Sequence, residues 1–225
     1  MDCVHDGMLA AGWSEGLPLV PPTAARVRAM LRDGTARKPD ATLGLCPPMY
    51  VAVTVEKVAA NAVMAGCEAR HLRVVIAAVE AMLASEFNLH GVHATTMGAT
   101  PCVIVSGPVR REAGLHSDHS ALGSASRANA CIGRAVKLVL QNIGGARLGG
   151  TESTTLGTPM KVGFCVAENE ELLGASTTTG GTGTGSEWAP YHVASRGCNA
   201  GDSCVTVVAL TSGPLQLVDF ATRDA

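Results

Sequence analysis

The sequence predicts an α/β fold, with α+β as the alternative, in which a central mixed sheet packs against three or four helices in a single domain, residues 1–225. Short apolar runs bounded by Pro and Gly, which are typical of buried strands, lie between longer segments of helical periodicity. A chain of 225 residues, 47% of them hydrophobic, is long enough to build one large core. Only 3% of the residues are aromatic and 26 are glycine, so small side chains are expected to dominate the packing.

Composition argues against several classes of protein. The formal net charge is -2 and the 17 Lys and Arg are dispersed, so no basic stripe is available to bind nucleic acid. No apolar run has the length of a membrane span, and the first residues carry acids instead of a basic leader, so we expect a cytoplasmic protein that binds no membrane. The eight cysteines follow no disulfide framework and are expected to be mostly reduced. The strong zinc signatures CxxC and HExxH are absent.

The N-terminal part is expected to form an extended arm (about residues 1–23) that begins with a short amphipathic helix at 2–13. Three prolines keep the arm extended: Pro18, Pro21 and Pro22. We expect this arm to wrap a neighbouring protomer in a homo-oligomer. Thr23 then caps a helix that ends at Gly34, a loop follows, and residues 49–53 form a strand.

The middle of the chain predicts a helical hairpin and a buried strand. Apolar residues recur at helical spacing in two segments, 55–66 and 69–85, which read as consecutive helices. The run CVIVSG (102–107) is the clearest buried strand. A long mobile loop is expected over 107–126, and Ser126 caps a further helix over 127–147.

The last third begins with a glycine-rich irregular segment that matches no nucleotide-binding fingerprint. Residues 161–167 then predict a buried strand, and residues of about 172–187 form a flexible low-complexity loop. Two final strands, 204–210 and 214–220, are predicted to pair as a hairpin.

Acidic residues follow the strand 161–167 directly, and we expect them to form part of an active site. Glu168 and Glu170 are candidates for the general base or acid, with Asn169 between them as a substrate-binding residue. Ligands of such sheets gather at the carboxyl ends of strands, and burial would raise the carboxyl pKa towards neutrality. The alternative is the start of a helix, where Asn169 caps the first turn and acids complement the macrodipole.

A second candidate group precedes the CVIVSG strand. His90 and His93 are spaced i, i+3, which would bring the imidazoles together on a turn beside Thr95 and Thr96. The histidines could exchange the second proton of an acid-base reaction, or hold a divalent metal. If they hold a metal, Glu170 would be the third ligand. The alternative is a pair of hydrogen-bonded structural histidines.

Two further elements could supply site residues. Arg127 and Asn129 lie at the start of the helix after Ser126, where free backbone N–H groups and the helix dipole can hold an anion. Ordinary capping is the alternative there. Cys165 is a candidate thiol, although its position in a strand indicates packing equally well.

Six stretches carry a resemblance that spans nearly the whole chain: GWSEGLPLVPPT, VEKVAANAVMAGC, FNLHGVHATT, RANACIGRAVKLVLQNIGGAR, FCVAENEE and EWAPYHV. They resemble a mostly uncharacterised bacterial family, whose members look to be encoded beside, or fused to, a protein ending in a Cys-Gly-Ser-Cys motif. The first cysteine of that motif is sometimes selenocysteine, and the motif is similar to the redox-active end of glycine reductase-type selenoproteins. The resemblance therefore implies a thiol- or selenol-bearing partner protein.

The chain also departs from that family. It contains no Cys-Gly-Ser-Cys motif, and Cys198 and Cys204 are too far apart in sequence to replace it, so no redox dithiol is expected. Residues 175–185 look like an insertion relative to the family.

These observations lead to a functional expectation with open alternatives. We expect an enzyme, or an enzyme subunit, that acts on a small anionic substrate by acid-base chemistry. The reaction would be that of a lyase or hydratase, or the reductive carbon-heteroatom cleavage of an oxidoreductase with the thiol or selenol partner. The alternatives are a non-catalytic structural subunit of a redox complex and a metal-dependent hydrolase.

Overall fold

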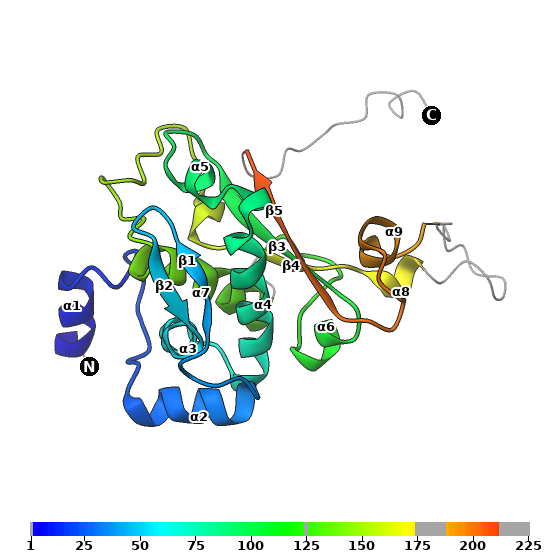
Figure 1. The fold of residues 1–225 in the computed structure, drawn as a ribbon, viewed down its shortest axis with the longest axis horizontal. Helices are drawn as coiled ribbons and strands as arrows, with labels where there is room; N and C mark the ends of the chain where they lie inside the picture. Colours follow the sequence, from blue (N-terminus) through cyan, green and yellow to red (C-terminus); the bar gives the residue numbers. More distant parts are fainter. Residues whose placement is uncertain (1, 124–125, 174–187, 212–225) are drawn as a thin grey trace.

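The computed structural model describes residues 2–123, 126–173 and 188–211, and it confirms a fold of mixed helices and sheet (Figure 1). The α-helices are α1 (Asp2–Ala10), α2 (Ala24–Gly34), α3 (Val55–Met64), α4 (Leu72–Leu83), α5 (Leu89–His93), α6 (Val109–Glu112), α7 (Arg127–Asn142), α8 (Glu170–Leu173) and α9 (Tyr191–Arg196). The strands are β1 (Thr42–Cys46), β2 (Val51–Thr54), β3 (Thr100–Ser106), β4 (Cys165–Ala167) and β5 (Cys204–Leu210). Three 3-10 helices complete the described elements: η1 (Ala69–His71), η2 (Ser85–Phe87) and η3 (Pro159–Val162).

The main sheet is mixed, as predicted, and has the strand order β4-β3-β5. Strand β3 runs parallel to β4, with Val103 opposite Cys165, and antiparallel to β5, with Val103 opposite Val207. β3 is buried along most of its length because it is the central strand. Of the two final strands predicted to form a hairpin, the first is confirmed as β5. The second, 214–220, lies outside the described residues. A separate antiparallel ribbon joins β1 to β2.

Helix α7 lies at the centre of the molecule, in contact with α3, α4 and β4. Its apolar stripe predicts one buried face, but almost every residue from Ile132 to Gln141 is buried. The chain before β4 crosses it closely at Gly133, where a Cβ would lie 2.7 Å from the backbone nitrogen of Phe164. Only glycine permits this approach, and it fixes β4 against the helix.

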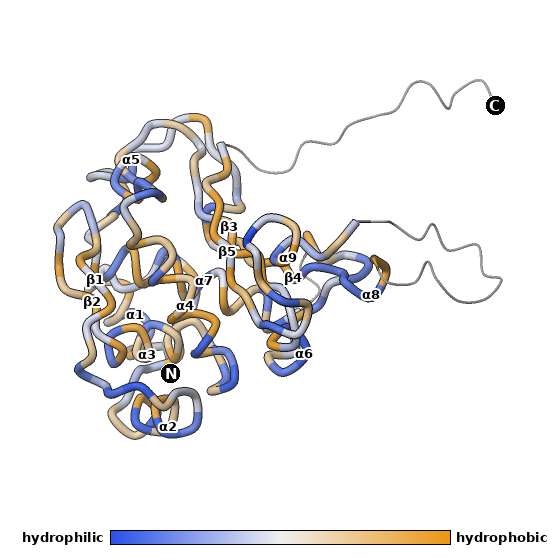
Figure 2. Tube along the Cα trace, turned by 45° about the vertical axis from the view of Figure 1, so that its right-hand side comes forward, coloured by the Kyte–Doolittle hydropathy of each residue, from blue (hydrophilic) through white to orange (hydrophobic). Residues whose placement is uncertain are grey.

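The helical hairpin of α3 and α4 is confirmed, and both helices bury an apolar face. Thr54 caps α3 by accepting a hydrogen bond from the backbone nitrogen of Lys57. α4 packs on both β1 and β5 and so joins the ribbon to the main sheet. In Figure 2, strands β3 and β5 run through hydrophobic colours, whereas much of the outer helix α2 is hydrophilic.

The N-terminal arm packs against its own chain. Leu19 is buried, and the backbone nitrogen of Val20 donates to the carbonyl oxygen of Met64 at 3.1 Å. Glu15 forms an ion pair with Arg134 of α7 at 2.5 Å. These contacts hold the arm against its own chain. The homo-oligomer, and the wrapping of a neighbour by the arm, stay predictions.

Three local predictions were wrong. The expected strand 161–167 begins only at Cys165, because Pro159 and the Thr158 cap start η3 over its first residues. The expected loop before residue 49 contains strand β1. The expected loop at 107–126 contains the short helix α6.

Across the described part of the chain, no helix has both the length and the apolar character that a bilayer span requires.

Candidate functional site

The carboxylates after β4 lie at the edge of the sheet where the parallel strands β3 and β4 both end. Glu168 accepts a hydrogen bond from Ser106 Oγ at 2.8 Å through Oε2. Through Oε1 it accepts from the backbone nitrogen of Tyr191, the first residue of α9, at 2.7 Å. Glu168 therefore connects the ends of two strands to the start of a helix.

Glu170 is held by a buried arginine that sequence reasoning missed. Its carboxylate accepts from the backbone nitrogen of Gly107 at 2.6 Å and from Arg110 at 2.8 Å. The Arg110 guanidinium is fully used, since its donors also reach the carbonyl oxygens of Gly107 and Glu168 and the carboxylate of Glu171. The two bonds from Arg110 to Glu171 form a bidentate contact, which is among the strong hydrogen bonds that a carboxylate can accept.

Arg110 and Arg111 together hold the pKa of Glu171 at about 2, with the hydrogen bond from Arg110 as the largest cause. Burial lowers the pKa of Arg110, but its bonds to Glu171 and Glu170 outweigh that and raise it. Glu170 and Glu171 also form the first turn of α8, so the helix-start alternative fits them. Asn169 is half-buried directly before this helix.

A third side chain, His192 of α9, faces these carboxylates. Its ring is 0% exposed, and neither ring nitrogen has a hydrogen-bond partner. Ligand atoms from Glu168, Glu170 and His192 lie within 4.8 Å of one another, the only such group of three or more in the described ranges. The sequence signal for His192 was weak, since the residue stands alone beyond the low-complexity segment.

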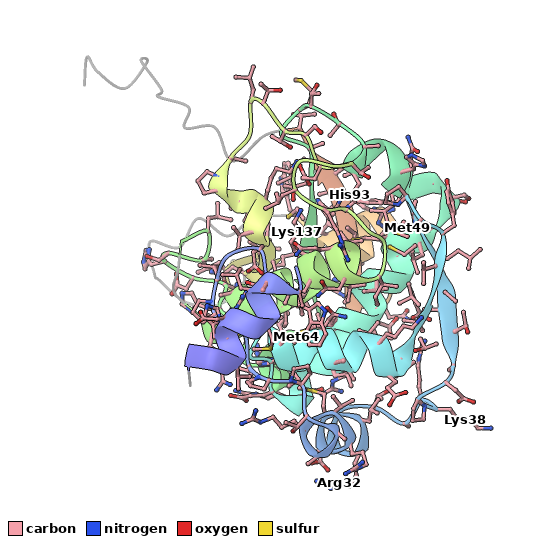
Figure 3. All side chains as sticks on the ribbon, turned by 90° about the vertical axis from the view of Figure 1, so that its left-hand side faces the viewer. Arg32, Lys38, Met49, Met64, His93 and Lys137 are labelled. Atoms are coloured by element: carbon pink, nitrogen blue, oxygen red, sulfur yellow. The ribbon has the colours of Figure 1, made fainter. Side chains whose placement is uncertain are left out.

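The structure separates the two histidines that the spacing paired. His90 is exposed, and its Nδ1 lies 3.0 Å from the hydroxyl of Tyr50. His93 is 3% exposed and points into the interior, where neither ring nitrogen has a partner (Figure 3). The joint metal site of His90, His93 and Glu170 is thus not formed. Thr95 caps the backbone nitrogen of Met97, and the carbonyl of Thr96 accepts from Thr155.

His93 is close to a charged cluster that the sequence did not reveal. The carboxylate of Glu152 receives Lys137 Nζ at 3.1 Å and Lys161 Nζ at 2.5 Å. All three side chains are 14% exposed or less. They line a pocket of about 490 Å³ together with Glu15, Gly149 and a set of apolar and hydroxyl side chains: Leu148, Ser153, Thr154, Thr158, Pro159 and Val162.

The pKa values of Glu152 and of the nearby His93 are both lowered, for different reasons. Burial raises the pKa of Glu152, but hydrogen bonds from Lys161 and Thr154 and the charge of Lys137 bring it to about 2. Burial lowers the pKa of His93 to about 4, helped by the charges of Lys137 and Lys161 and opposed by Glu152. The imidazole is therefore neutral at pH 7, in the electrostatic field of two ammonium groups.

The remaining predicted residues have structural contacts. Arg127 is exposed and pairs with Glu68 at 2.9 Å. Asn129 is buried and bonds the backbone nitrogen and oxygen of His116, so it closes the preceding loop. Cys165 is buried in β4, and burial raises its pKa well above the ordinary value, so the thiol is protonated and unreactive. The cysteines from Cys46 to Cys204 are free.

Comparisons with models of known protein families, with curated proteins and with solved structures find no match to this chain. The fold and the side chains therefore define its class. It is an α+β protein with one basic pocket beside α7 and one acidic cluster at the carboxyl ends of β3 and β4.

Proposed function

We propose that the chain is an enzyme, or an enzyme subunit, that binds a small anionic substrate in the pocket of Lys137, Glu152 and Lys161 and transfers a proton there. The second carboxylate of the lining, Glu15, is paired with Arg134, so the two lysines and Glu152 leave one positive charge, which favours a monoanion such as a carboxylate. This moves the acid-base centre expected at Glu168 and Glu170 to a different part of the fold.

The observation that carries the proposal is the unequal use of the two ammonium groups. Lys161 donates to Glu152, to Thr154 and to the carbonyl oxygen of Met97, so its three donors are used. Lys137 donates, among the described residues, to Glu152 alone. Two of its three N–H groups remain for a ligand, and an unsatisfied buried donor costs about 1–3 kcal/mol. A bound anion would satisfy them.

His93 is the proposed proton acceptor. Its neutral ring has no hydrogen-bond partner, and the charge of Lys137 is one cause of its low pKa. An anion bound at Lys137 would offset that charge and raise the pKa of His93, so binding would make the imidazole a better base. Proton abstraction of this kind suits lyase or hydratase chemistry.

The first test is anion binding. The full chain is titrated calorimetrically with acetate, pyruvate, malate and phosphate, and with Lys137→Met and Lys38→Met as variants. Lys38 is exposed and lies far from the pocket (Figure 3), so it is the matched control. A charge-assisted hydrogen bond is worth about 1.5–3 kcal/mol, so Lys137→Met should weaken binding roughly 10- to 100-fold while Lys38→Met leaves it unchanged.

Proton transfer is tested with the anions that bind. Each is incubated with the protein in D₂O, and exchange at carbon is followed by ¹H NMR. Exchange with the parent chain and its loss in His93→Gln supports the proposal. Binding that is equal in the parent chain and in Lys137→Met would contradict it, as would exchange that survives in His93→Gln.

A second candidate function, a subunit that binds the Cys-Gly-Ser-Cys partner protein, is favoured by the rim of this pocket. Met97, Leu148 and Leu156 are 56%, 67% and 78% exposed. Met97 and Leu156 are joined by a β-bridge, so apolar side chains gather there. Co-purification with that partner, lost in Leu156→Asp, is the expected result. No association at micromolar concentration would remove this candidate.

A further inference from the structure

We propose that Glu168, Glu170 and His192 bind a divalent transition-metal ion of the zinc type. This site is separate from the lysine pocket and goes beyond the function proposed above. It draws its ligands from three places: the residue after β4, the first turn of α8 and the first turn of α9. Two carboxylates and an imidazole are a ligand set that Zn²⁺ accepts, with a fourth position left for water.

The distances fit an ion after a small adjustment. His192 Nδ1 lies 3.8 Å from Glu170 Oε1, and one ligand atom from each of the three residues lies within 4.8 Å of the others. Tetrahedral zinc with bonds of about 2.1 Å places its ligand atoms about 3.4 Å apart. Side-chain rotations of a few tenths of an ångström to about one ångström would close this difference.

Both carboxylates are already oriented by other groups, as ligands of metal sites usually are. Ser106 Oγ and the backbone nitrogen of Tyr191 hold Glu168. The backbone nitrogen of Gly107 and the Arg110 guanidinium hold Glu170. Because each carboxylate oxygen carries two lone pairs, these bonds leave one pair on each oxygen for an ion.

The state of His192 is the independent reason to place a cation here. Its ring is 0% exposed, and neither nitrogen has a hydrogen-bond partner. A proton shared with Glu170 would also bring a positive charge, but 3.8 Å is too long for that hydrogen bond. An ion between the ring and the two carboxylates would satisfy Nδ1 and offset the negative charge that Arg110 leaves uncompensated.

The expected consequence is structural as well as chemical. The ion would bind α9 to the end of β4 and to α8, which Figure 1 shows next to each other at one end of the molecule. Metal binding would therefore raise the free energy of unfolding in proportion to the logarithm of the free metal concentration.

The test uses the full chain, purified without a histidine tag and freed of metal with a chelator. Co²⁺ is titrated as a spectroscopic probe, and Zn²⁺ is then added in competition. We expect one Co²⁺ per chain with visible absorption of a four- or five-coordinate site, displaced by Zn²⁺. His192→Gln should weaken binding by at least about 100-fold, since even groups behind the ligands account for 10- to 100-fold. His90→Gln, at an exposed histidine, is the matched control and should bind normally.

Glu168→Gln is the second variant, for the case that His192→Gln fails to fold. Its amide oxygen can still accept the hydrogen bond from the backbone nitrogen of Tyr191. It should also bind at least about tenfold more weakly. Circular dichroism establishes that each variant is folded. Failure of the parent chain to bind Co²⁺ or Zn²⁺, or equal binding by a folded His192→Gln or Glu168→Gln chain, would overturn the proposal.

Discussion

The ionised Glu152 carboxylate should stabilise the fold by a measurable amount that disappears in acid. Its pKa is about 2 in the folded chain against an ordinary value of 4.5, because Lys161, Thr154 and Lys137 hold the charged form. The difference is 4.5 minus about 2, or about 2.5, and each unit corresponds to about 1.4 kcal/mol, so the contribution is roughly 3 kcal/mol. Glu152 is 5% exposed, so solvent screens this interaction little.

Because folding lowers the pKa of Glu152, its contribution to the free energy of unfolding is lost when the pH falls. A carboxyl whose folded pKa is depressed contributes its full stability above pH 4.5 and loses it as the pH falls from 4.5 towards 2. Glu152→Gln resembles the protonated acid. It should lower the free energy of unfolding by roughly 3 kcal/mol at pH 7 and by much less near pH 2.

The assay is urea denaturation followed by circular dichroism at several pH values between 7 and 2. Glu56→Gln, at an exposed glutamate in the first turn of α3, is the control and should change stability by less than about 0.5 kcal/mol. A loss below about 1 kcal/mol for Glu152→Gln at pH 7, or a loss that is the same at pH 7 and pH 2.5, would refute the reasoning.

Three further predictions concern other buried groups. The pKa of His93 is about 4 in the folded chain and 6.5 ordinarily, so between pH 4 and 6.5 the unfolded chain binds more protons than the folded chain. The free energy of unfolding should therefore fall as the pH drops from 6.5 to 4, and His93→Phe should remove this dependence in the same denaturation series. Gly133→Ala places a Cβ 2.7 Å from the nitrogen of Phe164 and should cost about 1–3 kcal/mol, seen as a lower Tm, whereas Ala at Gly7, where no atom lies within 4 Å of the added Cβ, should not lower the Tm. Asn129→Leu breaks its bonds to the His116 backbone and should lower the urea midpoint, with faster amide exchange at residue 116.

The parts of the fold that could be predicted from sequence are those that local periodicity determines. Helices α3 and α4 carry one apolar face each, α3 also begins at a Thr cap, and β3 is a continuous apolar run between turn residues. The start of the acidic cluster could also be predicted, because the carboxyl ends of parallel strands meet at one edge of a sheet. β1 was missed because it has few β-branched residues.

The basic pocket could not be predicted, because its residues have no local signal. Lys137 lies between Val136 and Leu138 in a helix that is buried on nearly all sides, and periodicity locates a face but not a neighbour. Glu152 belongs to a glycine-rich segment without regular structure, and only the folded chain places its carboxylate between two lysines.

The histidine pair shows the same limit at a finer scale. Residues three apart on a helix differ by about 60° in direction, which counts as one face in a sequence pattern. At the rim of a helix as short as α5, that angle separates an exposed His90 from a buried His93. Spacing alone therefore paired the wrong imidazoles, while His192 reached the acids from the other side of the low-complexity segment.

The two sites are connected by one short piece of chain and differ in charge. Lys161 enters the basic pocket just before β4, and Glu168 enters the acidic cluster just after it. Between them, Phe164, Cys165 and Ala167 are buried apolar residues that carry no charge. The pocket has a surplus of positive charge, whereas Glu168 and Glu170 exceed the single charge of Arg110. The charges thus direct an anionic ligand and a metal cation to opposite ends of β4. A substitution that abolishes one site leaves the charged residues of the other site paired as before.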